Sequence, residues 1–309
     1  MYVLDFGRQS FYYIRYPSNN CTTPISGGPN PMTIPKRKQL GFNPAKIDDT
    51  PRGTVILAEP QSAHQRFLQG IPQETKVLLR ISDANTLLNR SETASTYYGD
   101  ETTVITTTTV QDKYLSELTW ERELELIKEF EPDYHIPCDY PVYKHDKEDQ
   151  RRGHVRNCLE GTLWVGQHLS DVKTRIIPLV KGETPSERGL CYRVFDEINA
   201  EYVAVYGTQY FLSGKGFSPL LETLQAIASE ASHLKIMLIG LQSPRLLEQA
   251  PPQVVAAAGQ RWIRQVQLRD VPLSNSHRLF GEMDCAITDS LSEGQAPLSM
   301  WTGSAEVTA

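Results

Sequence analysis

From residue 120 onward, short apolar segments alternate with longer amphipathic ones. The apolar segments, which we expect to be strands, cover residues 133–143, 174–180, 201–206, 235–239 and 261–268. The amphipathic segments, which we expect to be helices, cover residues 120–130, 152–168, 186–198, 219–232 and 244–258. A strand that is apolar along its whole length is buried on both faces, as in a parallel sheet covered by helices. The alternation therefore predicts parallel βα units in an α/β fold.

The first half of the chain supplies three further strand candidates, at residues 2–6, 54–58 and 76–81. Together with the five after residue 120 they make eight, which is the strand number of a TIM barrel. The predicted fold is therefore an α/β, TIM-barrel-like (β/α)8 domain. An open, doubly wound sheet is the alternative, although no Gly-x-Gly-x-x-Gly motif follows any of the expected strands.

Irregular sequence separates the strands of the first half. Residues 17–53 are rich in Pro, Gly, Asn and Lys, and residues 86–115 contain a stretch dominated by Ser and Thr that favours extended or hairpin structure. We expect both segments to be irregular insertions that decorate the N-terminal part. A single domain over residues 1–286 is predicted, followed by a small-residue, polar and flexible tail at residues 287–309.

Charge and cysteine content bear on where the protein works. The formal net charge is −6, which does not favour a strongly basic nucleic-acid-binding surface. Arg151, Arg152 and Arg156 form either a local basic patch or an ordinary solvated helix face. The five cysteines are scattered, as in a reducing compartment. The chain has no apolar run of the about 18–20 residues that a membrane span needs, and its N-terminus lacks the features of a signal peptide. We expect a cytoplasmic protein without membrane contact.

Candidate site residues follow from the predicted barrel, because the active site of a (β/α)8 barrel lies at the C-terminal ends of its strands. Two carboxylates in one partly dry pocket can divide the roles of nucleophile or base and of acid, since their repulsion separates their pKa values. The expected strand ends carry Asp5, Glu59, Asp83, Asp139, Asp270, Lys181, Gly182, Gly207 and Gly240. The catalytic candidates are Asp139, Asp270 and Asp5.

Asp139 is the strongest of these candidates, since one proline stands two residues before it and another two residues after it, which fixes the local backbone. Each candidate also has a purely structural interpretation. Asp139 would then cap a turn or pair with an arginine, and Asp5 would belong to a turn. Lys181 would be solvated, and the glycines would form tight turns instead of admitting a ligand close to the backbone.

Four residues have a spacing typical of zinc ligands. His135 and Cys138 are three residues apart, and His154 and Cys158 are four apart. Side chains of a strand point alternately to opposite faces, however, and no Cys-x-x-Cys pair is present. We therefore expect neither a metal nor another cofactor.

The order of elements from about residue 120 to residue 262 is similar to that of the tRNA-guanine transglycosylases and their DNA-modifying relatives, TIM barrels that exchange guanine for a 7-deazaguanine. The similarity rests on four strand-end motifs: Pro137-Cys138-Asp139, Val180-Lys181-Gly182, Tyr206-Gly207 and Gly240-Leu241-Gln242-Ser243-Pro244. It implies that Asp139 recognises the base and that Lys181 and Gly207 lie on the edge of the purine, with Gly182 and Gly240 completing the substrate-binding set. Lys181 stands where the family has a glutamine.

The resemblance implies an enzyme that exchanges a guanine-type base in DNA or tRNA. One carboxylate attacks the anomeric carbon, and a second acid or base manages the leaving base. The family's nucleophile would follow Gly259, where this chain has Gln260 and Arg261, so Asp270 is the nearest substitute. Arg264 would bind a phosphate.

Two other classes of function compete with base exchange. One is a barrel that has lost its nucleophile and binds a nucleobase, a nucleic acid or a protein partner. The other is an unrelated hydrolase or lyase of the same fold. The sequence leaves open the choice between DNA and tRNA, and whether the chain forms a homodimer.

Overall fold

We analysed a computed structural model of the chain. The described residues are 42–46, 50–71, 74–169, 171–212, 216–268 and 272–293. By its internal contacts the chain divides after Ile34, and the described residues all belong to the second unit, Pro35–Ala309. The expected strand at residues 2–6 and the candidates Asp5 and Asp270 lie outside the described residues.

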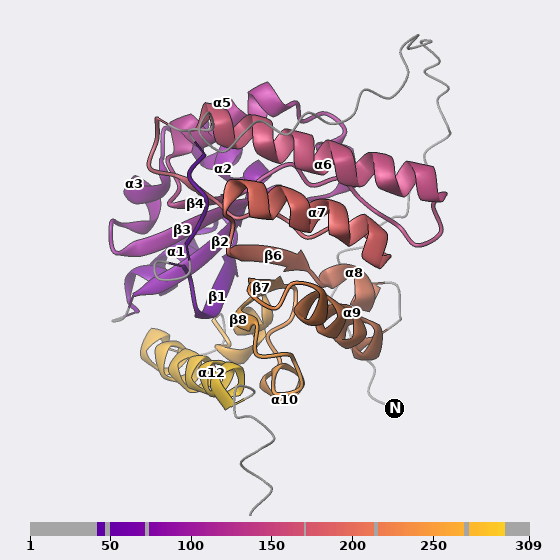
Figure 1. The fold of residues 1–309 in the computed structure, drawn as a ribbon. Coiled ribbons are helices and arrows are strands. Elements are labelled where there is room, and N and C mark those ends of the chain that lie inside the picture. The colour runs from indigo at the N-terminus through magenta and orange to yellow at the C-terminus, as the bar shows by residue number, and fades with distance from the viewer. Residues whose placement is uncertain are drawn as a thin grey trace, which may run out of the picture. The chain divides into compact units, whose positions relative to one another are not determined.

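Eight parallel strands form a single curled sheet (Figure 1). The strands are β1 (Gly53–Ala58), β2 (Thr75–Arg80), β3 (Thr102–Thr107), β4 (Tyr134–Ile136), β5 (Arg175–Ile176), β6 (Tyr202–Tyr206), β7 (Lys235–Ile239) and β8 (Val254–Gly259). Their order in the sheet is β5-β4-β3-β2-β1-β8-β7-β6, so the first strand pairs with the last. The arrangement is an α/β fold that is compatible with a TIM-like barrel.

The two outer strands of this sheet are joined by backbone hydrogen bonds just beyond β5. The amide of Val180 donates to the carbonyl of Ala204 over 3.0 Å, and the amide of Ala204 donates to the carbonyl of Pro178 over 2.9 Å. Within β5 itself, Ile176 pairs with residues 43–45, where the amide of Ala45 donates to the carbonyl of Ile176. Part of the segment expected to be an irregular excursion therefore pairs with β5.

Twelve helices occur among the described residues: α1 (Ser62–Gln69), α2 (Ile81–Leu88), α3 (Ala94–Tyr98), α4 (Asp112–Leu115), α5 (Trp120–Phe130), α6 (Glu148–His168), α7 (Pro185–Ile198), α8 (Thr208–Leu212), α9 (Phe217–Glu230), α10 (Pro244–Leu247), α11 (Arg261–Gln265) and α12 (Leu273–Glu293). Helices α5, α6 and α7 lie side by side against the sheet, and α12 packs on β1 and β8 (Figure 1). Thr119 caps α5 as its sequence predicts, since its hydroxyl accepts a hydrogen bond from the amide of Arg122.

The inside of the curled sheet is filled by side chains from nearly every strand. Val55, Leu78, Ile105, Tyr202 and Met237 belong to this core, and each is less than about a tenth exposed. Burial of each such side chain contributes roughly 1.5–3 kcal/mol to folding. The hydrophobic core therefore lies inside the curled sheet.

Six of the eight expected strands are confirmed, namely those that became β1, β2 and β4 to β7. The seventh, at residues 261–268, is wrong: that segment begins with α11, and the preceding strand is β8. Residues 244–258 were expected to be helical, and only their first part is, as α10. Val254–Gly259 is instead buried along its whole length between β1 and β7, where small residues fit the close strand contacts.

The other unexpected strand is β3, within the segment 86–115 that was expected to be an irregular insertion. Its Thr-rich sequence does form extended structure, as β-branched residues favour, but it pairs with β2 and β4 inside the sheet. Helices α2, α3 and α4 account for much of the rest of that segment. At the C-terminal end, α12 runs to Glu293, beyond the start of the tail expected at residue 287, because Ile287 and Leu291 are buried.

Candidate functional site

Parallel strands bring their C-terminal ends to one edge, and polar side chains gather there. We call Glu59, Arg80, Asp139, Lys181, Tyr206 and Gln260 the strand-end site. Glu59 and Gln260 directly follow β1 and β8, Arg80 and Tyr206 end β2 and β6, and Asp139 and Lys181 follow β4 and β5. Residues far apart in the chain thus meet at one place, which is where (β/α)8 enzymes hold their substrates.

A buried ion pair joins Lys181 to Asp139. The ammonium nitrogen contacts Oδ1 of Asp139, and the two side chains are 10% and 7% exposed. Burial alone lowers the pKa of Lys181, but the Asp139 carboxylate and the Cys158 thiol outweigh it, so that the pKa is raised. Lys181 is therefore protonated at neutral pH and faces Asp139 as a cation.

Tyr206, at the end of β6, is affected by the charges of this ion pair and by that of Arg80. Burial raises the pKa of its phenol, while the charges of Lys181 and Arg80 act in the opposite direction. The phenol therefore stays protonated at neutral pH and can donate a hydrogen bond. Arg80 and Lys181 are therefore both near enough to the Tyr206 phenol to lower its pKa.

Glu59 organises the second group of charges. Its carboxylate accepts hydrogen bonds from Nε2 of Gln260 at 3.0 Å and from Nε2 of Gln61 at 2.6 Å. Arg80 lies 3.6 Å from Glu59 and 3.8 Å from Asp83. Desolvation raises the pKa of Asp83 to about 6, although Arg80 opposes this shift. The strand-end site thus contains two carboxylates held by cations: Glu59 by Arg80, and Asp139 by Lys181.

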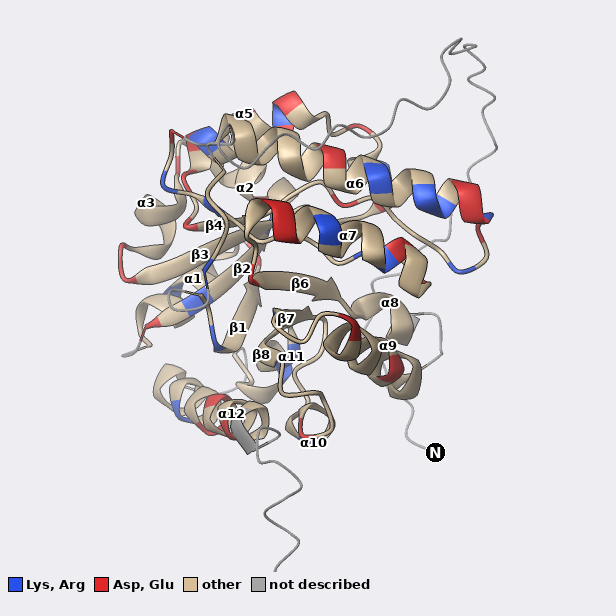
Figure 2. Cartoon of the chain, viewed as in Figure 1, with Lys and Arg blue, Asp and Glu red and all other residues tan. Residues whose placement is uncertain are grey.

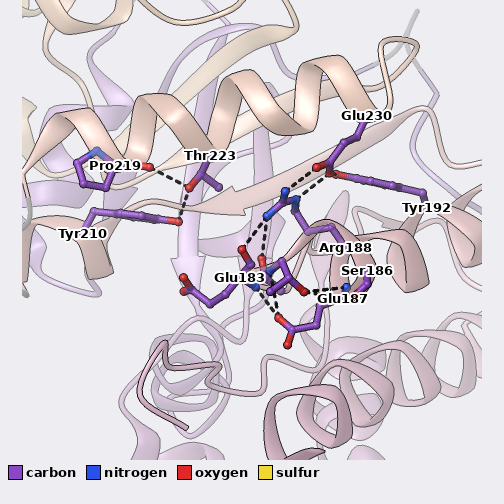
Figure 3. Close-up of polar contacts among 11 residues, drawn as sticks. Glu183, Ser186, Glu187, Arg188, Tyr192, Tyr210, Pro219, Thr223 and Glu230 are labelled. Atoms are coloured by element: carbon purple, nitrogen blue, oxygen red, sulfur yellow. Dashed lines mark hydrogen bonds and ion pairs between the residues drawn. The ribbon is translucent and has the colours of Figure 1, made fainter. Parts of the chain in front are cut away.

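Beside Lys181 the surface is hollowed between the ends of β5 and β6 and helices α7, α8 and α9, with about 440 Å³ of empty space that is partly open to solvent. Arg188 in its wall binds Glu230 through two hydrogen bonds of 2.8 and 2.5 Å (Figure 3). Across the hollow, the hydroxyls of Tyr210 and Thr223 lie 2.9 Å apart (Figure 3). The walls of the hollow are therefore held by their own polar contacts.

The structure brings three of the predicted site residues together: Asp139, Lys181 and Gly182. Asp139 pairs with this lysine, and not with an arginine as its structural interpretation supposed. Gly240 has a φ of +104°, and a Cβ atom there would lie 2.8 Å from the amide nitrogen of Thr208. The close approach at Gly240 is thus made by the protein's own backbone. Arg264 is exposed on α11.

The zinc-like residues are engaged in other contacts. The two ring nitrogens of His135 face Glu123 and Thr106, and Nδ1 of His154 contacts the carbonyl of Pro141. Among the residues that the structure describes, no three His, Cys, Asp or Glu side chains are grouped to hold a metal ion.

The arginines considered as a basic patch are part of an ordinary helix surface. Positive and negative residues both occur along α6 and α7 (Figure 2). Arg151 binds the buried carboxylate of Glu187 over 2.9 Å, and Arg152 lies 4.0 Å from Glu148. Arg151 therefore has a structural role in attaching α6 to the start of α7.

Sequence reasoning missed Arg80, Tyr206, Gln260 and the buried Glu123 as parts of the site or of its support. Arg80 and Gln260 carried no motif, and Tyr206 was noted only as the residue before Gly207; the sheet order is what brings the three together. Glu123 did leave a signal, since it lies three and seven residues before Leu126 and Phe130 on the apolar face of α5. An acidic residue in that position predicts a buried partner.

No protein-family model matches the chain, and no curated protein sequence matches it. Within the described part of the chain, every helix is too short or too polar to cross a membrane.

Proposed function

We propose that the chain is a transglycosylase-like enzyme that exchanges a guanine-type base, such as a 7-deazaguanine, in DNA or tRNA at the strand-end site. The observation that carries the proposal is the buried Asp139–Lys181 pair at the ends of β4 and β5. It lies where the resemblance places recognition of the base. In this proposal the curled sheet is a full (β/α)8 barrel, since Val180 and Ala204 link its outer strands.

The pair offers a carboxylate acceptor and an ammonium donor side by side. Guanine presents N–H donors next to its O6 acceptor, and lysine is a frequent partner of O6 and N7. Asp139 would accept from the N–H groups while Lys181 donates to O6, with the Tyr206 phenol available as a further donor. A base held in a duplex would first have to be flipped out of the stack.

The exchange itself needs a second carboxylate. In the step we propose, a carboxylate oxygen forms a bond to the anomeric carbon while the bond from that carbon to the base nitrogen breaks and its electron pair leaves with the base. The incoming base then reverses the step with its own nitrogen. Asp270, the residue closest to the family's nucleophile position, and Asp5 lie outside the described residues.

A second candidate function is a barrel that binds a base or a nucleic acid without chemistry. The observation that favours it is the engagement of both carboxylates at the site. Asp139 is paired with Lys181, and Glu59 is held by Arg80 and Gln260. A carboxylate that is already paired is a poor nucleophile, but it is well suited to recognising a ligand.

As partners we propose a DNA or tRNA substrate and a free purine-like base, with the protein acting in the cytoplasm. No cofactor enters the proposed reaction, because carboxylates supply both the nucleophile and the proton transfer. Arg264, exposed on α11, is the described cation that we expect to contact a phosphate.

Incorporation of labelled guanine and of a labelled 7-deazaguanine into DNA and into tRNA tests the proposal. Wild type should label one polymer, and Asp139→Asn should lose about 100-fold or more of that rate. Asp139→Asn leaves the buried Lys181 cation without its counter-charge, which can destabilise the fold. The double variant Asp139→Asn/Lys181→Met removes both charges and serves as the comparison for this effect. Asp100→Asn, at an exposed position, is the matched control.

Incorporation by wild type and by Asp100→Asn, but by neither Asp139 variant, would support base exchange and identify the polymer. Folded wild type that labels neither polymer, yet binds guanine in equilibrium dialysis, would favour the binding barrel. Folded wild type that neither labels nor binds would overturn both functions.

A further inference from the structure

Helix α5 carries a carboxylate on its apolar face. Glu123 is 2% exposed and lies among the buried Leu126, Ile127 and Phe130. Its Oε1 atom accepts hydrogen bonds from Nε2 of His135 at 2.8 Å and from the amide of Cys138 at 3.1 Å. The Cys138 thiol lies 3.5 Å from Oε2. Both of these partner residues belong to β4 and to the loop that follows it.

The contacts continue from β4 to β3. His135 is fully buried, and its Nδ1 atom lies 2.9 Å from the hydroxyl of Thr106. Two residues further along, the hydroxyl of Thr108 donates to the carbonyl of Ile136 at 3.1 Å and accepts from the amide of Asp139 at 2.9 Å. Polar contacts thus hold the loop before Asp139 from the helix on one side and from β3 on the other.

The residue between these contacts has an unusual backbone. Cys138 has a φ of 51°, in the left-handed region that residues other than glycine rarely adopt. Its thiol packs against Gly161 of α6, where an added Cβ atom would lie 2.6 Å from the sulfur. Asp139 follows directly, so the direction of its side chain depends on this turn. A conformation of this kind persists only where its surroundings hold it.

We propose that Glu123 is a positioning residue of the strand-end site, which holds Cys138 in its left-handed turn and thereby sets Asp139 against Lys181. The hydrogen bond from His135 holds the Glu123 carboxylate in place for this role. Its relevance to base exchange rests on the proposed function. The placement of Asp139 against Lys181 does not, because it can be measured without any substrate.

The rate of Lys181 acetylation by labelled acetic anhydride, followed by peptide mass spectrometry, reports on the ion pair. Glu123→Ala should raise that rate about tenfold or more, because it removes a charged acceptor from two buried donors. Glu123→Gln should raise it about threefold, since the amide oxygen still accepts both bonds but carries no charge. Glu129→Ala, exposed on the same helix, should match wild type, and so should acetylation of Lys235 in every variant.

A second substitution separates positioning from general loss of packing. Glycine adopts a positive φ without strain. Adding Cys138→Gly to Glu123→Ala should therefore bring the Lys181 rate back toward that of the Cys138→Gly single variant. If Glu123→Ala does not fold, the same comparison is made with Glu123→Gln. Lys181 acetylation that equals wild type in a folded Glu123 variant, or that rises only together with Lys235, would overturn the proposal.

The base-exchange assay on the same proteins keeps the two proposals apart. Faster Lys181 acetylation in the Glu123 variants, with no base exchange by wild type, would leave the positioning role intact and refute the function. Base exchange by wild type, with unchanged Lys181 acetylation in folded Glu123→Ala, would support the function and refute the positioning role.

Discussion

Asp83 is an acidic side chain that the fold takes largely out of water. It lies in the first turn of α2, and its nearest cation, Arg80, is 3.8 Å away. Desolvation raises its pKa from 3.8 to about 6 in the folded protein. The folded state therefore holds this proton more tightly than the unfolded chain does. Stability from this group is complete below about pH 4 and is lost as the pH rises through 6.

Asp83→Asn removes the cost of ionising this group. We expect the variant to be more stable than wild type at pH 7.5 by on the order of 1 kcal/mol, after allowance for solvent screening. The gain should vanish near pH 4. Urea unfolding at pH 4.5 and 7.5, with Asp100→Asn as the exposed control, measures the difference. A gain of equal size at both pH values would contradict the assignment to ionisation.

At the scale of the element, the start of α7 is bonded both to α6 and to the loop that follows Lys181. Thr184 and Glu187 form a capping box, and Pro185 occupies the first turn. The fully buried Glu187 carboxylate accepts from the amides of Glu183 and Thr184 at 2.8 and 3.2 Å, and from Nε of Arg151 at 2.9 Å. One side chain therefore caps α7 and also anchors α6.

Glu187→Ala should destabilise the protein by about 3 kcal/mol, because Arg151 and two amides lose their acceptor inside the fold. Thr184→Ala removes only one capping bond and should cost about 1 kcal/mol. Urea midpoints of the two variants at constant slope provide the comparison. Equal losses would show that the Arg151 ion pair adds nothing to the cap.

At the scale of the whole molecule, the seam between β5 and β6 is weakly paired. Strands β2 and β3 pair over six residues, whereas β5 is linked to β6 by the two hydrogen bonds between Pro178, Val180 and Ala204. Local opening starts where few backbone hydrogen bonds hold an element in place. The seam lies next to Lys181, so its opening would also disturb the strand-end site.

Native-state hydrogen exchange should detect the opening of this seam. We expect the amide of Val180 to exchange about tenfold or more faster than those of Val77 and Leu78, which lie in the centre of the sheet. Peptide-resolved mass spectrometry compares both regions in one sample, so the central strands serve as the internal control. Equal protection would mean that the sheet opens only as a whole.

The sequence alone determined what depends on local pattern. Continuous apolar runs predicted six strands, the period of α5 predicted that helix with its Thr119 cap, and the strand-end rule selected Asp139 and Lys181. The structure decided what depends on neighbours distant in the chain. Val254–Gly259 became a strand because β1 and β7 flank it, and the Thr-rich β3 found its place between β2 and β4.

Only the tertiary structure paired Asp139 with Lys181, Glu59 with Arg80 and Gln260, and Glu123 with Cys138. The physical reason is one of range. Helical and strand periodicity are set by residues within a few positions of one another. Ion pairs and buried hydrogen bonds form between atoms that meet only once the sheet has curled and its strand ends share one edge.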